Sequence, residues 1–292
     1  MSTPPAPPDS FLSAPELPDG VEPRRHPRWP PWTSALALLT ALFGALLGAA
    51  VIGAVATVFG ADFDSPGVTI GGTLFQDACL IGSALLFARM SGPARPWQFG
   101  LRPTRFWPAL GWMLLTWVAF YAFTAAWVGL LGLNPEEEKL PEQLGVDRST
   151  AAMLGAAFLV SVAAPVAEEF FFRGFFFNAL RNWRGVWPAA AITGIVFGSI
   201  HAGSSDPAFL APLAVFGIGL CLLYVRTGSL YPCIALHCVN NSVAFGATQD
   251  WTWQIPVLLV AALAIIALGG RALGRVWAAR PPAPAPAPAP AA

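Results

Sequence analysis

Eight apolar segments, most of them long enough to cross a lipid bilayer, dominate this sequence. They cover roughly residues 33–59, 68–88, 107–131, 150–180, 187–203, 208–225, 230–248 and 253–270. A helix needs about 20 apolar residues to cross the hydrocarbon core, and only the fifth segment is marginal in length. Every backbone polar group in lipid must find a partner within the chain, so these segments are predicted to be helices. The sequence therefore predicts an all-α polytopic membrane protein with eight transmembrane helices.

Composition agrees with this fold class. The chain is 55% hydrophobic and 11% charged, whereas a soluble domain is about 25% charged. The lipid bilayer is therefore an expected partner, and nucleic acid is not. The cysteines all fall in apolar segments without CxxC spacing, so we expect small buried side chains and neither disulfides nor a zinc ribbon. They are Cys79, Cys221, Cys233 and Cys238.

The basic residues alternate between the two sides of the predicted bundle. Thirteen of the sixteen Lys and Arg residues lie before the first segment or after the even-numbered segments. The opposite loops hold only Lys139 and Arg148, and Arg173 lies within the fourth segment. By the positive-inside rule both termini are predicted to be cytoplasmic. The Ala- and Pro-rich composition further favours a bacterial cell membrane.

The composition along the chain divides it into five parts. Residues 1–31 are predicted to be a disordered Pro-rich cytoplasmic tail, and 32–149 to hold three transmembrane helices. Residues 150–246 contain most of the buried polar groups. The last transmembrane helix is expected within 247–275, and a disordered Pro/Ala tail over 276–292.

Three ionisable residues stand close together in the fourth apolar segment. They are Glu168, Glu169 and Arg173. A single charged side chain at a helix centre costs about 2.5–3.5 kcal/mol even on lenient insertion scales. These residues are therefore expected to pair with one another or to take part in a reaction. Glu169 and Arg173 are spaced i,i+4, which predicts an ion pair with a supporting role. Glu168 is about 140° around the helix from Arg173, so its carboxylate remains available.

Residues from two further helices are predicted to reach the depth of Glu168. At about 1.5 Å per residue, Glu168 and His201 both lie about 20 Å from the cytoplasmic edge. Asn241 lies about 18 Å deep, and His237 is one turn shallower on the same helix face. Asn240 is expected to point about 100° away from Asn241. The shared depth predicts a polar site among the fourth, fifth and seventh helices.

Other polar and aromatic positions receive structural interpretations. Asp77, in the second segment, has no partner by spacing and is interpreted as a local hydrogen-bonding residue. Pro165 removes a backbone hydrogen bond, which could leave a carbonyl for a side chain or water. The runs Phe170–Phe172 and Phe175–Phe177 are interpreted as lipid-facing or packing bulk.

Two hydrolytic mechanisms fit the polar residues. In one, Glu168, His201 and His237 hold a divalent metal such as Zn whose bound water attacks a carbonyl. In the other, no metal is used: Glu168 is the general base, and His201 orients the water. His237 and Asn241 then donate hydrogen bonds to the oxyanion. The sequence has no HExxH motif and no GxSxG motif, so neither a zincin nor a serine hydrolase is indicated.

Three motifs in order resemble those of the CAAX-protease and bacteriocin-processing (CPBP, or Abi) family of intramembrane proteases. They are Glu168-Glu169-x-x-x-Arg173, Phe197-x-x-x-His201 and His237-x-x-x-Asn241. The resemblance covers about residues 150–246, which it implies to be the catalytic core. It also implies an all-helical fold with a cavity among the matching helices. It also implies an intramembrane endopeptidase, commonly labelled a metalloprotease, that hydrolyses a membrane-associated peptide or protein. Glu168, His201, His237 and Asn241 would be its catalytic residues.

Two other functions are open to the same sequence. One is a non-catalytic protein, for bacteriocin self-immunity or as a membrane adaptor, whose polar cluster serves structure alone. The other is a transporter, because buried Glu and His residues can form a proton relay. No obvious inverted repeat or pair of broken helices supports transport. All three motifs are intact, which favours an active protease.

Overall fold

The computed structural model describes residues 27–133 and 140–278. Within these ranges the structure is helical and contains no strand, which confirms the predicted all-α class. The long helices are α1 (Trp32–Val58), α2 (Pro66–Arg89), α3 (Phe106–Leu131), α8 (Val186–Ser199), α9 (Pro207–Thr227), α10 (Tyr231–Thr248) and α11 (Gln254–Ala278). Short helices cover Pro96–Phe99 and α4 (Leu140–Gln143).

Residues Thr150–Arg184 form one further helix of 35 residues at the centre of the molecule. It comprises α5 (Thr150–Phe158), α6 (Ala164–Glu169) and α7 (Phe177–Arg184), joined by π-helical segments at Leu159–Ala163 and Phe170–Phe176. The second segment contains Arg173, and Glu169 ends the helix before it. Single π-helical turns are rare overall and occur often at functional sites. The helix that carries the first motif is therefore irregular on both sides of the two glutamates, and Arg173 lies within the second irregular segment.

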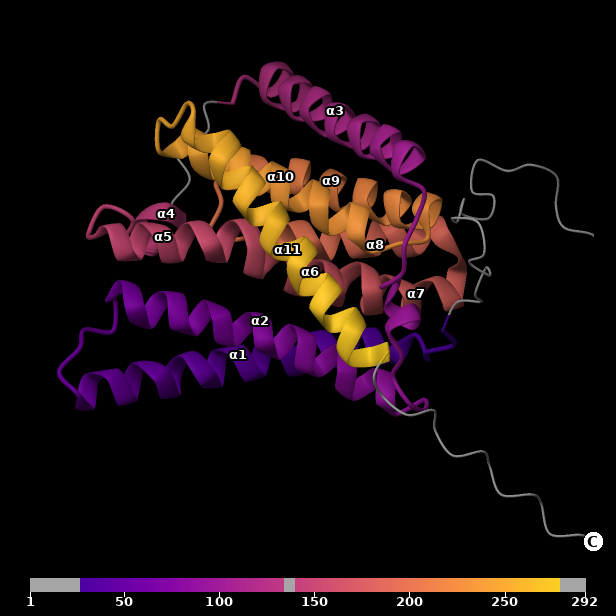
Figure 1. The fold of residues 1–292 in the computed structure, drawn as a ribbon, viewed down its shortest axis with the longest axis horizontal. Helices are drawn as coiled ribbons and strands as arrows, with labels where there is room; N and C mark the ends of the chain where they lie inside the picture. Colours follow the sequence, from indigo (N-terminus) through magenta and orange to yellow (C-terminus); the bar gives the residue numbers. More distant parts are fainter. Residues whose placement is uncertain (1–26, 134–139, 279–292) are drawn as a thin grey trace, which may run out of the picture.

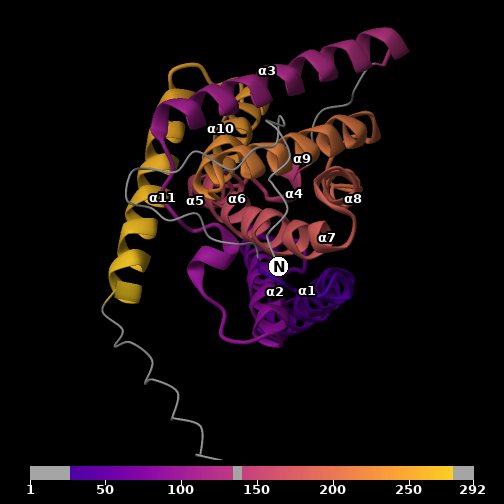
Figure 2. The same cartoon turned by 90° about the vertical axis from the view of Figure 1, so that its right-hand side faces the viewer.

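The helices pack in layers around this central helix. The hairpin of α1 and α2 covers one side, and α8, α9 and α10 cover the other (Figures 1 and 2). Helix α3 lies outside α9, and α11 runs along α10 and the first π-helical segment. The central helix is thus enclosed by other helices, which permits it to carry charged groups away from lipid.

All eight predicted segments are helical, but they differ in how well they meet the requirements of a membrane span. Six helices are long and apolar enough by length and composition: α1, α2, α3, Thr150–Arg184, α9 and Gln254–Arg275. Helix α8 is apolar but has only 14 residues. Helix α10 has 18 residues and carries His237, Asn240 and Asn241. Six candidate spans are therefore established, and the count of eight stays a prediction.

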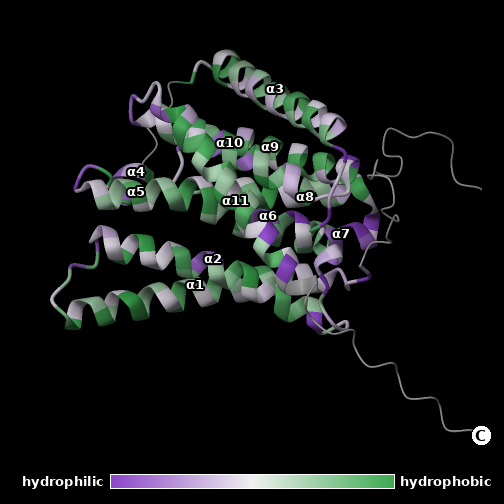
Figure 3. Ribbon diagram, viewed as in Figure 1, coloured by the Kyte–Doolittle hydropathy of each residue, from purple (hydrophilic) through white to green (hydrophobic). Residues whose placement is uncertain are grey.

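The outer surface is apolar, as expected of helices that face lipid. Large side chains such as Leu46 of α1, Trp107 of α3 and Val260 of α11 are exposed. Apolar residues cover most of these helices, whereas hydrophilic residues gather around α7 and near α4 (Figure 3). Apolar surface of this extent is rare on soluble monomers. The chain is an integral membrane protein.

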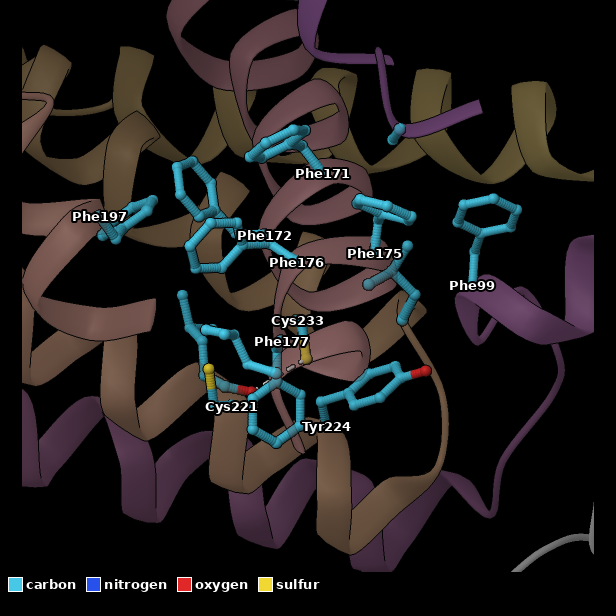
Figure 4. Packing of buried hydrophobic residues seen from close by; sticks show 14 of the residues in the cluster. Phe99, Phe171, Phe172, Phe175, Phe176, Phe177, Phe197, Cys221, Tyr224 and Cys233 are labelled. Atoms are coloured by element: carbon cyan, nitrogen blue, oxygen red, sulfur yellow. Dashed lines mark hydrogen bonds between the residues drawn. The ribbon is translucent and has the colours of Figure 1, made fainter. Parts of the chain in front are cut away.

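The phenylalanine runs of the central helix pack inside the protein. Phe171, Phe172, Phe175, Phe176 and Phe177 are all buried in the main core. Figure 4 shows them around their helix, with Phe197, Phe99 and Tyr224 from neighbouring segments. The prediction that these phenylalanines fill the packed interior is therefore confirmed for these five, and the alternative that they face lipid is wrong. Cys221, Cys233 and Cys238 are unpaired and buried as predicted, whereas Cys79, also unpaired, is only partly buried, so the prediction of burial is wrong for it.

Two glycines let α8 and α9 approach closely. A methyl group on Gly198 would lie 2.5 Å from the carbonyl oxygen of Leu210, and one on Gly194 would lie 2.5 Å from that of Ala214. Small residues spaced four apart are a common way to bring membrane helices together. Gly198 precedes His201 by three residues, so this contact fixes the end of α8 that presents the histidine.

The predicted tails lie largely outside the described residues. So does the loop segment 134–139, which contains Lys139 and three of the acidic residues in the alternation of charges. The described end of the N-terminal tail packs on the core. Trp29 is buried between Phe99 and Phe175, with ring centroids 5.0 and 4.9 Å away. Asn182 donates hydrogen bonds to the carbonyls of Pro27 and Trp29.

Candidate active site

Glu169 and Arg173 form the ion pair that their spacing predicts. Arg173 Nη1 lies 2.7 Å from Glu169 Oε1, and both side chains are 0% exposed. Arg173 Nη2 also donates to the carbonyl oxygen of Gly217 at 3.1 Å, and the guanidinium lies 4.5 Å from the ring centroid of Phe197. These contacts tie the central helix to α8 and α9. A fully buried pair of this kind is stable only with such additional hydrogen bonds.

His237 of α10 lies between the two glutamates. Its Nδ1 donates to Glu169 Oε1 at 2.8 Å, since a carboxylate oxygen accepts. Its Nε2 is directed toward Glu168, with 3.8 Å to Oε2. Phe197 and Phe216 both contact the ring edge-on. Glu169 therefore binds Arg173 and also fixes the orientation of the His237 ring.

Glu168 is the less engaged of the two acids. Its side chain is 13% exposed. Its Oε2 is buried and has no hydrogen-bond partner among the described residues. This agrees with the prediction that Glu168 is free of Arg173. A carboxylate with an unused oxygen beside a histidine can accept a proton from a molecule that reaches it.

His201 lies just beyond the end of α8. Its Nδ1 is 2.8 Å from the carbonyl oxygen of Phe197. Because a carbonyl only accepts, Nδ1 carries the hydrogen and Nε2 is left as an acceptor. The following residues, 202–205, form a turn stabilised by a hydrogen bond from the Ser204 hydroxyl to the His201 carbonyl. The ring is therefore fixed by its own helix end.

Asn241 binds a carbonyl that the π-helical segment leaves available. Its Nδ2 donates to the carbonyl oxygen of Val160 at 3.1 Å. In a π-helix that carbonyl would accept from the amide five residues on, which is Pro165, and proline has no N–H. The prediction that Pro165 leaves a carbonyl for a side chain is thus confirmed. The amide nitrogen of Asn241 has a second hydrogen to donate.

One cavity of about 470 Å³ brings the predicted residues together. Its lining includes Glu168, His201, His237 and Asn241. Residues of α4 and of the turn after α8, among them Gln143, Gly203 and Ser204, also line it. Glu169 and Arg173 are not in the lining, so they support the site from behind. The cavity thus extends from the polar cluster toward the end of the bundle where α4 lies.

The cavity has two further polar residues that the sequence interpretation set aside. Asn240 lines it beside Asn241, and its Oδ1 is buried without a partner among the described residues. Asp77 of α2 also lines it, and its Oδ2 is likewise buried without a partner in the described chain. The interpretation of Asp77 as a local hydrogen-bonding residue is therefore wrong for this oxygen. Its position in an apolar segment was a signal, but spacing along the chain could not identify the helix it faces.

The donor groups of the cavity decide whether a metal fits. Glu168, His201 and His237 share the cavity lining. Among residues 27–133 and 140–278, however, no group of three or more His, Cys, Asp or Glu side chains is placed to hold a metal ion. The side chains as arranged do not form a ligand set, so the zinc site stays a prediction.

Comparison with known proteins supports the motif assignment. Residues 150–243 match the family described as type II CAAX prenyl endopeptidase Rce1-like. A Bacillus subtilis protein described as "Putative membrane peptidase YdiL" is 27% identical over 113 residues, which are 39% of this chain and 44% of that protein. An Escherichia coli protein described as "Uncharacterized 24.3 kDa protein" is 29% identical over 123 residues, 40% of this chain and 56% of that protein. No solved structure matches.

The fold and the buried site define the chain as a polytopic helical membrane protein with a polar cavity inside its bundle. Its segment 150–243 matches the Rce1-like CAAX-protease family, which confirms the resemblance seen in the three motifs. The chain spans about half the length of the curated relatives it matches. The matched segment contains every motif residue, whereas Asp77 lies outside it.

Proposed function

We propose that this protein is an intramembrane endopeptidase that hydrolyses a peptide bond of a membrane-associated peptide or protein. Glu168 is the general base. His201 orients the attacking water through Nε2, because its Nδ1 is committed to the Phe197 carbonyl. His237 donates to the oxyanion through Nε2, which requires both of its ring nitrogens to carry a hydrogen because Nδ1 already donates to Glu169, and the second amide hydrogen of Asn241 is the other donor. Glu169 and Arg173 position His237 and do not touch the substrate.

The reaction follows from these roles. Glu168 takes a proton from water as the water oxygen bonds to the scissile carbonyl carbon. The negative charge that develops on the carbonyl oxygen is stabilised by the two donors in a site of low dielectric constant. Glu168 then gives the proton to the leaving nitrogen as the C–N bond breaks. The products are a carboxylic acid and an amine, and Glu168 returns to its starting state.

The observation that carries this proposal is the cavity that Glu168, His201, His237 and Asn241 line together. Glu168 and Asn240 line this cavity and each have a buried oxygen without a partner among the described residues, whereas Glu169 and Arg173, which also have such atoms, lie outside the lining. The Rce1-like match favours a peptidase over an adaptor or a transporter.

The first test is a pair of substitutions in the purified full chain. Glu168→Gln preserves shape but removes the base, so we expect the cleavage rate to fall by about 10²–10⁴-fold, the usual contribution of a general base. For His201→Ala the cleavage rate is expected to fall by a factor within the same range. Asp250→Asn, a change in a loop away from the cavity lining, is the control. Full cleavage by folded Glu168→Gln would refute the assignment.

The role of a metal is tested separately. The metal-free mechanism predicts that cleavage continues after treatment with a chelator and that the active protein carries less than one equivalent of metal. Loss of cleavage on chelation, with recovery on adding one divalent ion, would instead establish the zinc-type mechanism. Both measurements use the same membrane peptide and the wild-type protein.

A further inference from the structure

Asp77 is the acidic residue of the described cavity wall that the proposed mechanism does not use. It lies in α2, outside the segment that matches the protease family, and it is 5% exposed. Its Oδ2 has no hydrogen-bond partner among the described residues. Thr73 and Gln76, which precede it by four and one positions, line the same cavity. Residues four apart share a helix face, so α2 presents a polar strip to the site.

A buried carboxyl group without a partner is costly, because its desolvation is not repaid by a hydrogen bond. Helix α2 satisfies its other buried polar group internally: the Ser83 hydroxyl donates to the Leu80 carbonyl at 3.0 Å. The difference is that Asp77 faces the cavity. Its partner is therefore expected to be a group that enters the cavity from outside the protein.

The charge of the cavity indicates what that group is. The described lining contains two carboxylic acids, Asp77 and Glu168, and no Lys or Arg. Asp77 reaches this cavity from α2, and Glu168 reaches it from the central helix. A cation is complementary to such a pair, and an ammonium or guanidinium group also donates hydrogen bonds to the free oxygen. Charge pairs of this kind are strong where water is excluded.

We propose that Asp77 is a specificity-determining residue that binds a basic side chain, Lys or Arg, of the peptide substrate close to the scissile bond. The inference rests on the proposed endopeptidase function, since it places this side chain beside Glu168.

A second hollow adjoins the cavity on the side away from Glu168, His201 and His237. It has a volume of about 650 Å³ and shares Thr73, Gln76 and Gln143 with the first cavity. It extends between α1 and α2 toward Asp64 and Arg148. Arg148 there donates to the Asp64 carbonyl at 3.1 Å. An extended peptide that follows α2 through both hollows passes Asp77 where it reaches Glu168.

The test is the cleavage preference of the full chain in detergent micelles, using an equimolar synthetic peptide library with mass-spectrometric reading of the cut sites. For the wild type we expect Lys and Arg to be enriched by about tenfold or more at one position near the cut. Asp77→Asn is expected to abolish that enrichment. Asp250→Asn removes the same charge away from the cavity lining and is expected to retain it.

The outcomes separate this inference from the proposed function. If the wild type cleaves peptides without enriching Lys or Arg near the cut, the role of Asp77 is overturned and the proposed peptidase function stands. This outcome is measured on the wild type alone, so it does not depend on the folding of a variant. Enrichment that persists in Asp77→Asn overturns it as well. Absence of any product dependent on Glu168 overturns the peptidase, and the inference fails with it.

Discussion

Glu168 and Glu169 are neighbours in sequence but occupy different environments. Glu169 is fully buried and accepts hydrogen bonds from Arg173 and His237. Glu168 lines the cavity and Glu169 does not, although each keeps one oxygen without a partner among the described residues. The one-residue offset on a helix turns the two carboxylates about 100° apart. Adjacent residues of the same type can therefore serve structure and chemistry separately.

The two acids are expected to respond differently to substitution. Glu169→Ala leaves Arg173 buried without its ionic partner, which costs about 3–5 kcal/mol. Glu168→Gln leaves the Glu169–Arg173 pair intact and is expected to keep the unfolding temperature near that of the wild type. Thermal unfolding of both variants in the same detergent measures the difference. Equal unfolding temperatures for Glu169→Ala and the wild type would contradict the supporting role of Glu169.

At the scale of elements, the position of His201 depends on the contact between α8 and α9. The glycines Gly194, Gly198 and Gly217 bring the two helices together, and a methyl group on Gly217 would lie 2.8 Å from the Cα of Gly194. His201 follows Gly198 by only three residues, so a displacement of α8 at Gly198 is expected to move the histidine as well.

Gly198→Ala tests this dependence. The added methyl group would meet the backbone of α9, so we expect a loss of about 1–3 kcal/mol in stability together with reduced cleavage. Gly82→Ala is the matched control, because no described atom outside its own helix lies within 4 Å of the added methyl group. Stability and cleavage rate are measured on both variants. A Gly198→Ala protein that equals Gly82→Ala in both would show that the close contact is unimportant.

The sequence predicted the features that depend on local spacing. The helices follow from the demands of lipid on the backbone, and the Glu169–Arg173 pair follows from i,i+4 geometry. Asp77 could not be assigned in this way, because its position in the cavity results from the packing of α2 against the central helix. Asn240 was set aside for its angle from Asn241, yet the cavity is wide enough to include both.

At the scale of the whole molecule, the cavity and the basic residues lie toward opposite ends of the bundle. The cavity is lined by Gln143 of α4 and Thr248 at the end of α10. Arg89 and Arg184 end α2 and α7 at the other side, where hydrophilic residues gather in Figure 3. Combined with the predicted cytoplasmic termini, this arrangement predicts that the cavity opens away from the cytoplasm.

Cysteine labelling in intact cells tests this orientation. Ser204→Cys places a thiol in the cavity lining, and Ser91→Cys places one in the exposed loop after α2. We expect a membrane-impermeant maleimide to modify Ser204→Cys in intact cells and Ser91→Cys only after the membrane is opened. The wild type, with its four cysteines in apolar helices, gives the baseline. The opposite labelling pattern would place the termini outside, and peptide substrates would then reach Glu168 from the cytoplasm.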